Sequence, residues 1–214
     1  MPGLFISFEG IEGSGKSTQV VLLADALRSQ GHEVVVTREP GGTPRGQVLR
    51  QMLLDPTGSP LAPRAELLMM LADRAQHVQE IIAPGLSSNK IVITDRFADS
   101  TTAYQGYGRG FDLALLHQLN TFACSSAIPT LTFLMDLSVT EGLQRAHYRR
   151  GNIAAADHFE AESVAFHERV REGFLAVARA EPHRIYVLDA TRLKELVHQE
   201  SLAVVLSKLE KREA

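Results

Sequence analysis

Short apolar stretches alternate along this chain with segments of helical periodicity. Five stretches are rich in β-branched and aromatic residues: Leu4–Phe8, Glu33–Thr37, Ile91–Thr94, Leu131–Met135 and Ile185–Leu188. Several of them are apolar at consecutive positions, which is typical of strands covered on both faces of a parallel sheet. We therefore expect five short strands, most of them buried.

The segments between these strands carry the spacing of amphipathic helices. Apolar residues recur at i, i+3, i+4 and i+7 within residues 20–27 and again within residues 202–209. This spacing places four apolar side chains on one face of a helix. Alternating strand and helix patterns predict an α/β fold, a five-stranded parallel sheet with helices on both faces.

Length and composition favour one globular domain over residues 1–214, because the chain has 214 residues, 44% hydrophobic and 22% charged. The single cysteine, Cys124, excludes an internal disulfide, and its apolar helical surroundings predict a core position. The longest strictly apolar run is Leu67–Ala72, which is too short to cross a membrane. The N-terminus lacks the pattern of a signal peptide, so we expect a cytoplasmic protein without a membrane partner.

The charge balance limits the classes of partner. A net charge of −3 disfavours a nucleic-acid polymer, because proteins that bind such polymers are usually basic. Small phosphorylated ligands need only a few cations in one cleft. Only five of the 22 basic residues are lysines, and this excess of arginine suits bidentate phosphate recognition. A genome rich in G and C would give the same excess.

One motif points to nucleotide binding. Residues 10–17, Gly-Ile-Glu-Gly-Ser-Gly-Lys-Ser, match the phosphate loop G-x-x-x-x-G-K-[ST] and lie between an expected strand and an expected helix. Its backbone N–H groups converge on phosphate oxygens at the helix N-terminus. We expect Lys16 to neutralise the β- and γ-phosphates of ATP and Ser17 to ligate Mg²⁺. The predicted ATP-binding residues are Gly10, Ile11, Glu12, Gly13, Ser14, Gly15, Lys16, Ser17 and Thr18.

The rest of the chain decides between the classes of phosphate-loop protein. A GTPase should carry Asn-Lys-x-Asp, but the only Asn-Lys pair, at 89–90, runs into a strand. The acidic strand end and signature loop of a transport ATPase are not found. Arg38 and Arg96 instead follow two expected strands, whose carboxyl ends face the crevice of the phosphate loop. A phosphoryl donor and a phosphorylated acceptor in one cleft indicate a nucleoside monophosphate kinase.

Two further segments carry a family resemblance. Thr-Arg-Glu-Pro-Gly-Gly at 37–42, and Asp-Arg-Phe at 95–97 followed by Ala-Tyr-Gln-Gly at 103–106, resemble thymidylate kinases of the bacterial type. The resemblance extends to about Glu162. It implies a phosphate-loop NTPase fold with a short lid at about 145–162. It also implies a usually homodimeric enzyme that transfers the γ-phosphoryl group of MgATP to dTMP, giving dTDP and ADP for dTTP synthesis.

The resemblance also implies roles for individual residues. Arg96 would bridge the dTMP phosphate and the transferring group, and Arg38 and Arg50 would hold that phosphate. Glu12 would lie near the sugar. Asp95 would act on Mg²⁺ indirectly, by contacting a group that ligates the ion. The remaining contacts would be Arg74, Thr101 and Gln105 on the thymine and Tyr104 against the sugar, disfavouring a ribose 2′-hydroxyl.

Each of these roles has a plainer alternative. Arg50 and Arg74 could be solvated helix residues, Tyr104 could be core, and Asp95 could cap a helix. An acid within an anion-binding loop, as at Glu12, is best explained by sugar recognition.

The chain departs from the family pattern at two places. Met70 stands where the family commonly stacks an aromatic on thymine; it could cover the base through its polarisable sulfur or belong to the core. In the lid, His158 stands in place of an arginine. We therefore expect Arg149 or Arg150 to close over the ATP phosphates, whereas Arg145 has the helical spacing for a surface ion pair with Glu141.

The sequence leaves three alternatives open. A kinase for a different small acceptor remains the alternative enzyme, and a nucleotide-binding switch or scaffold is the alternative outside enzymes. A helix at Ala65–Gln79 could serve a dimer interface or the core.

Overall fold

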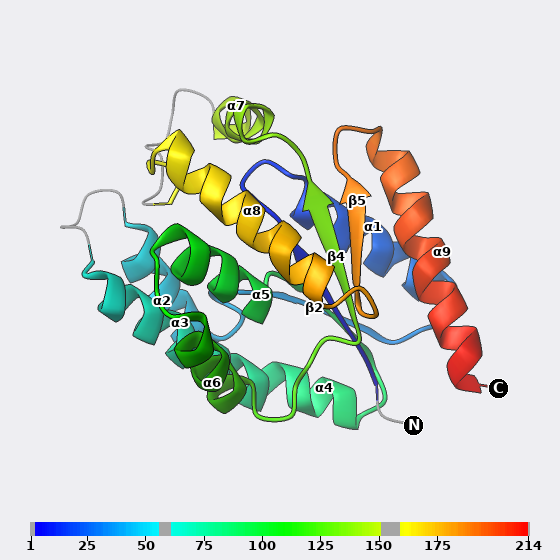
Figure 1. Ribbon diagram of the computed structural model, residues 1–214. Helices are drawn as coiled ribbons and strands as arrows, with labels where there is room; N and C mark the ends of the chain where they lie inside the picture. The colour runs from blue at the N-terminus through cyan, green and yellow to red at the C-terminus, as the bar shows by residue number, and fades with distance from the viewer. Residues whose placement is uncertain (1–2, 56–60, 151–158, 214) are drawn as a thin grey trace.

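Five parallel strands form one sheet in the order β2-β3-β1-β4-β5, as Figure 1 shows for this computed structural model. The structure describes residues 3–55, 61–150 and 159–213. The strands are β1 (Leu4–Glu9), β2 (Val34–Arg38), β3 (Ile91–Asp95), β4 (Leu131–Asp136) and β5 (Ile185–Asp189). The predicted fold class is therefore confirmed: an α/β fold with a five-stranded parallel sheet.

Every strand ends one residue later than its apolar pattern predicted, and β2 also begins one residue later. The added residue is always charged, and the ladder continues through it: Asp95 is in register with Phe8 and Arg38, and Asp136 with Asp189. Hydrophobic patterning does not detect such residues, because they extend the hydrogen-bonded ladder after the core has ended. They also place charged side chains at the carboxyl edge of the sheet, where ligands of such folds bind.

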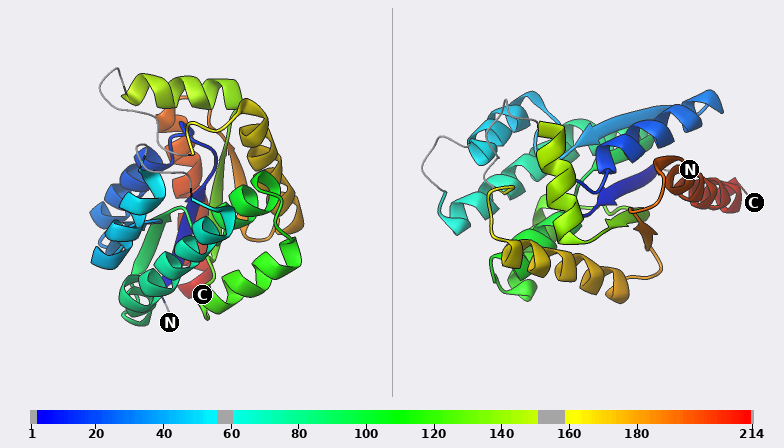
Figure 2. Two further views of the ribbon diagram at one scale, coloured as in Figure 1. Left: turned by 90° about the vertical axis from the view of Figure 1, so that its left-hand side faces the viewer. Right: turned by 90° about the horizontal axis from the view of Figure 1, so that it is seen from above.

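Helices cover both faces of the sheet, as the views of Figure 2 show. On one face α1 (Lys16–Ser29) packs on β1, β2 and β3 and against α9 (Lys194–Glu213). On the other, α4 (Ala83–Ser87) contacts β3, and α8 (Val164–Ala180) contacts β4 and β5. The remaining helices are α2 (Pro44–Leu54), α3 (Pro63–His77), α5 (Ala98–Thr101), α6 (Leu113–Cys124) and α7 (Val139–Arg150), with π-helical segments η1 (Val78–Ile82) and η2 (Thr102–Gly108).

The predicted helices are present, with boundaries set by local chemistry. The periodic segments 20–27 and 202–209 lie inside α1 and α9. The helix expected at 65–79 begins earlier, at Pro63, because proline fits the first helical turn, and it changes into η1 after His77. Cys124 ends α6 and is buried, as predicted. None of the described helices combines the length and apolar character needed to cross a membrane.

The core follows from the position of each strand in the sheet. The three central strands are buried nearly throughout, whereas the edge strands β2 and β5 leave Val36 and Tyr186 about two-fifths exposed. In the centre, the ring of Phe8 lies 5.1 Å from that of Phe133, measured between centroids. These two rings join β1 to β4 beneath the phosphate loop.

We expect Phe133→Ala to lower the free energy of unfolding by about 3–5 kcal/mol, because it removes a fully buried ring and leaves a cavity. Urea denaturation measures the change. Leu193→Ala is the control, since Leu193 is 70% exposed, and it should cost less than about 0.5 kcal/mol. Equal losses in the two variants would contradict this account of the core.

Candidate active site

The phosphate loop joins β1 to α1 and depends on glycine at three positions. Gly10, Gly13 and Gly15 have φ angles of 137°, 71° and 89°, which other residues rarely adopt. At Gly13 a Cβ atom would also come within 2.0 Å of the Gly142 carbonyl oxygen. The chain therefore needs glycine both to turn and to pass α7. Of the other predicted loop residues, Ile11 and Ser14 are buried and Thr18 is exposed in the first turn of α1.

Lys16 lies folded onto this loop. Its ammonium group donates hydrogen bonds to the carbonyl oxygens of Gly10 (3.0 Å) and Ile11 (2.7 Å) and to Ser14 Oγ (3.2 Å). Burial, helped by the nearby charge of Arg96, lowers the pKa of Lys16 to about 8. The Lys16 ammonium group is thus held against the turn of the phosphate loop.

The two residues predicted to handle the metal lie together. The Ser17 hydroxyl, in the first turn of α1, donates a hydrogen bond to Asp95 Oδ2 at the end of β3. A hydroxyl and a carboxylate are hard oxygen donors, which suit Mg²⁺. Asp95 does not cap a helix, since α5 begins at Ala98 with Phe97 as its N-cap.

Arg96 connects the phosphate loop to the rest of the cleft. Its guanidinium donates to the Gly10 carbonyl (2.9 Å), Ser100 Oγ (3.1 Å), Glu12 Oε1 (2.8 Å) and the Tyr104 hydroxyl (3.0 Å). Its backbone has a φ of 73°, an unfavourable conformation for a non-glycine residue. Such strain is found mainly where a functional side chain must be aimed.

Glu12 is the acidic residue inside the anion-binding loop. Burial alone would raise its pKa, but the charge of Arg96 and hydrogen bonds, including that from Tyr104, hold the pKa well below its usual range. The carboxylate therefore stays ionised at neutral pH. The Tyr104 hydroxyl donates to the same oxygen as Arg96, and its ring packs edge-on to Phe159. Tyr104 thus belongs to the core through its ring and to the cleft through its hydroxyl.

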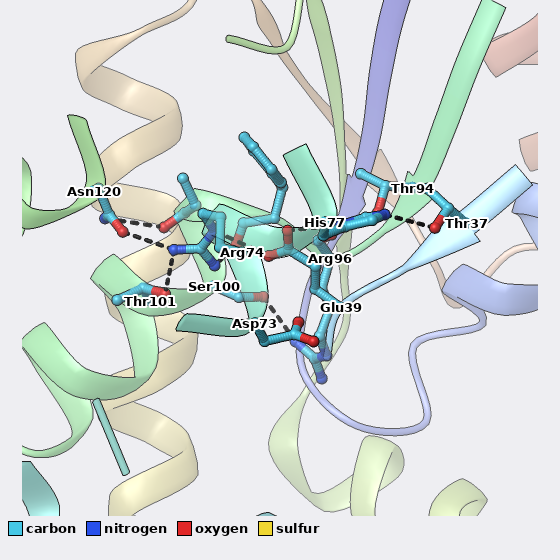
Figure 3. A network of polar contacts seen from close by, with 12 residues as sticks. Thr37, Glu39, Asp73, Arg74, His77, Thr94, Arg96, Ser100, Thr101 and Asn120 are labelled. Carbon is cyan, nitrogen blue, oxygen red and sulfur yellow. Dashed lines mark hydrogen bonds and ion pairs between the residues drawn. The ribbon is translucent and has the colours of Figure 1, made fainter. Parts of the chain in front are cut away.

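Arg74 is not a solvated helix residue. It is 3% exposed and donates to Glu39 (2.9 Å), Thr101 (2.9 Å) and Asn120 (2.7 Å), and to the carbonyl of Phe97 (3.1 Å), as Figure 3 shows in part. Glu39 is itself shared, because it also accepts a hydrogen bond from His77. This network fixes both Arg74 and Thr101.

Arg38 and Arg50 line the same cleft as Arg74. Arg50 donates to the Pro40 carbonyl at 2.9 Å and packs against Gly41, where any Cβ atom would meet its side chain. Arg38 is exposed at the end of β2 and has no polar partner among the described residues. A guanidinium in this state is available to an anionic ligand.

One cleft contains most of the residues that the sequence pointed to. Its predicted lining residues are Glu12, Gly13, Lys16, Ser17, Arg38, Arg50, Met70, Arg74, Asp95, Arg96, Thr101, Tyr104, Gln105 and Arg149. Met70 lines the cleft and also packs on the main core. Gln105 donates to Glu66, and this bond orients its side-chain amide.

The lid is described only at its two ends. Arg149, near the end of α7, lines the cleft, and its side chain is 67% exposed. Its Nη2 atom lies 3.6 Å from Oε1 of Glu160. The side chain of Arg150 and all of His158 lie outside the described residues. The expected ion pair between Arg145 and Glu141 is present.

Sequence reasoning gave no role to several residues of this cleft, notably Glu39, Asp73, Phe97, Ser100 and Phe159. All five stand directly beside a residue that was singled out, namely Arg38, Arg74, Arg96, Thr101 or His158. Adjacency in sequence does not show which side chains face the cleft, because that depends on packing between distant segments.

Glu9, the last residue of β1, is a second buried carboxyl that the sequence did not single out. It accepts hydrogen bonds from the Phe97 amide (2.7 Å) and Ser100 Oγ (2.5 Å). Burial, together with the charge of Asp99, raises the pKa of Glu9 to about 8. It therefore holds the start of α5, directly behind Arg96.

With this geometry in place, comparisons with known proteins identify the family. The family model described as thymidylate kinase matches residues 8–201. The chain belongs to the thymidylate kinase family. It is therefore an enzyme of the kinase class, a transferase that binds nucleotides.

Individual thymidylate kinases match most of the chain. That of Desulfovibrio desulfuricans is 51% identical over 195 residues, 90% of this chain and 90% of its own. That of Geobacter sulfurreducens is 48% identical over 212 residues, 98% of this chain and 100% of its own. The crystal structure of the Ehrlichia chaffeensis thymidylate kinase superposes with a TM-score of 0.76 and 38% identity, over 96% of this chain and 99% of that one. The resemblance to the bacterial type is thus confirmed.

We expect the pH dependence of stability to reveal Glu9. Its pKa is about 8 when folded and near the ordinary 4.5 when unfolded, so the folded state binds more protons between these values. The contribution of Glu9 to stability is therefore complete below about pH 4.5 and is lost as the pH rises through 8. In urea denaturation, wild-type protein should lose stability relative to Glu9→Gln between about pH 5 and 9. Parallel pH profiles of the two proteins would show that Glu9 titrates normally.

Proposed function

We propose that this kinase transfers the γ-phosphoryl group of MgATP to dTMP, giving dTDP and ADP for dTTP synthesis in the cytoplasm. The observation that carries the proposal is one cleft that Lys16 and Ser17 of the phosphate loop line together with four arginines, Arg38, Arg50, Arg74 and Arg96. Donor and acceptor phosphates could meet there without further movement of the sheet.

At the donor end, the N–H groups of residues 10–18 would bind the phosphates of ATP. Lys16 would leave the loop carbonyls and turn to the β- and γ-oxygens, exchanging one set of acceptors for another. Ser17 would ligate Mg²⁺, with Asp95 as its indirect partner, and the ion would neutralise charge on the β- and γ-phosphates when bound.

At the acceptor end, Arg38 and Arg50 would hold the phosphate of dTMP. Arg96 would contact both that phosphate and the transferring group, where its rigid fork stabilises charge that spreads in the transition state. No general base is needed, because an acceptor phosphate oxygen is already an anionic nucleophile.

Recognition of the nucleoside rests on the buried network. Arg74, Thr101 and Gln105 would face the edge of thymine, with Met70 covering the base through its flexible, polarisable side chain. Tyr104 would lie against the sugar and exclude a 2′-hydroxyl, with Glu12 nearby. Because Glu39 and Asn120 fix Arg74, it would select a base without first losing side-chain entropy.

Coupled ADP release with dTMP, dUMP, UMP, dCMP and AMP tests the acceptor. We expect kcat/KM for dUMP to be about tenfold below that for dTMP, because one methyl group is worth little in an apolar pocket. UMP, with its 2′-hydroxyl, should fall at least a further tenfold, and dCMP and AMP should be poorer still. Equal turnover of dUMP would mean that Met70 leaves the base pocket loose, and turnover of a different monophosphate alone would contradict the acceptor.

The lid arginines can be tested together. Replacing Arg149 and Arg150 by alanine should lower kcat at least 100-fold, because the loop between Gly13 and Lys16 supplies no other cation, and should change KM for dTMP less than threefold. Arg179→Ala is the matched control, since Arg179 pairs with Glu172 near the other end of α8. Unchanged kcat in the double variant would remove the lid from the mechanism.

We also propose that the enzyme is a homodimer, formed by the outer surfaces of α3 and α6. These two helices pack on each other, and Leu68, Leu115 and Phe122 on them are 60%, 45% and 88% exposed. The inner side of α3 belongs to the core through Leu67 and Leu71. Helix α3 would therefore serve both alternatives that its sequence left open.

Phe122→Glu should convert the dimer to monomer in sedimentation velocity at micromolar concentration, because it places a charge in an apolar interface. Leu193→Glu, an exposed position before α9, is the control and should leave the dimer intact. A dimer that survives Phe122→Glu would place the interface elsewhere.

A further inference from the structure

Two buried polar groups from distant segments face each other beneath the cleft. Glu12, in the phosphate loop, directs Oε1 to Arg96 and Tyr104, while its other oxygen, Oε2, makes no hydrogen bond of good geometry. On α8, His167 is 1% exposed, and neither of its ring nitrogens has a hydrogen-bond partner. Nδ1 of His167 lies 3.5 Å from Oε2 of Glu12. These two atoms are close enough to satisfy each other.

The chemistry of the pair decides the protonation of Nδ1. Glu12 stays ionised, because the Arg96 guanidinium and the Tyr104 hydroxyl both donate to Oε1 and favour the carboxylate, so Oε2 can only accept. A neutral imidazole protonated at Nε2 would turn the Nδ1 lone pair toward this carboxylate, and two buried acceptors would then face each other with no donor between them. A proton on Nδ1 instead places a donor opposite an acceptor. This state satisfies both Nδ1 and Oε2, whereas Nε2 of His167 has no partner among the described residues in either state.

We propose that His167, protonated at Nδ1, is a positioning residue that donates to Oε2 of Glu12 and fixes the plane of its carboxylate. Oε1 is thereby aimed at the Arg96 guanidinium and the Tyr104 hydroxyl together. Through Glu12, helix α8 would hold these groups in place before dTMP binds. This inference rests on the proposed role of Glu12 at the sugar of the acceptor.

His167 has the rigid setting that such a role requires. Ser163 caps the N-terminus of α8 by accepting a hydrogen bond from the Phe166 amide, and the His167 amide donates to the Ser163 carbonyl. The guanidinium carbon of Arg109 lies 4.7 Å from the centroid of the Phe166 ring, and this ring packs edge-on to the ring of His167. The first turn of α8 is thus fixed from both sides, and its imidazole has little freedom to turn away from Glu12.

Steady-state kinetics of three variants test the proposal. His167→Phe keeps a ring but removes the donor, and it should raise KM for dTMP about tenfold with KM for ATP unchanged within twofold. His167→Asn places an amide nitrogen near the position of Nδ1, and it should keep KM for dTMP within threefold of wild type. His198→Phe is the control, because His198 also has a buried, unpaired Nδ1 but lies on α9, and it should change neither KM.

A double-mutant cycle shows whether His167 acts through Glu12. In a Glu12→Gln background, His167→Phe should change KM for dTMP less than twofold. A full tenfold effect there, or equal behaviour of the Phe and Asn variants, would overturn the proposal and leave His167 a packing residue. Glu12→Gln alone tests the proposed sugar contact: if it leaves KM for dTMP unchanged, that contact is wrong whatever His167 does.

The protonation state gives a readout that is independent of dTMP. Long-range ¹H–¹⁵N spectra of the histidine rings should show His167 protonated at Nδ1, and the signal should be lost in His167→Phe. A neutral ring protonated at Nε2 would overturn the proposal even if Glu12 binds the sugar as proposed.

Discussion

The arrangement of this cleft depends on one strained arginine. Arg96 leaves the end of β3 with a positive φ, and its guanidinium is held by four partners from three segments: Gly10, Glu12, Ser100 and Tyr104. The backbone cost of this conformation is of the order of 1–3 kcal/mol and must be offset by these contacts. Under the proposed function, the donor and acceptor phosphates would share this one rigid cation. A phosphoryl transfer enzyme gains from this rigidity, because the charge is in place before the transition state forms.

The groups around Arg96 show how the fold tolerates so many buried charges. Glu12 faces Arg96, Glu39 faces Arg74 and His77, and Asp99 makes a bidentate pair with Arg184. Glu9 and Asp73 are exceptions, since burial and a neighbouring carboxyl (Asp99 for Glu9, Glu39 for Asp73) raise their pKa values to about 8 and about 6. Burying such pairs contributes little net stability, but separating them is costly. The network therefore acts mainly to fix side-chain positions, which is what selection of a base and alignment of phosphates require.

Much of the fold was predictable because it follows from local patterns. Consecutive apolar residues identified every strand, and the glycines and Lys16 of the phosphate loop identified the donor end. The charged residue at each strand end was missed, since hydrogen bonding there continues beyond the hydrophobic pattern. Of these residues, Arg38 and Asp95 line the cleft, and the sequence singled out both as site residues although it left them outside the strands.

The partners of the site residues were beyond a single sequence. Arg74 contacts Glu39, Thr101 and Asn120, which lie 35, 27 and 46 residues away, and no periodicity relates such positions. The same holds for Glu12 and His167, which are far apart in sequence and meet only where α8 approaches the phosphate loop. Family resemblance could name Glu12 and Arg74, whereas only the packed structure shows what orients them.

The most direct test of this account is Arg96→Lys, which keeps the charge but loses the planar fork. We expect kcat to fall about 1,000-fold, while calorimetry shows ATP and dTMP binding weakened less than tenfold, because one cation on a flexible stem cannot serve both phosphates at once. The thermal midpoint should confirm that the variant is folded. If instead kcat stays within tenfold of wild type, Arg96 does not join the two ends of the cleft, and the account built on it is wrong.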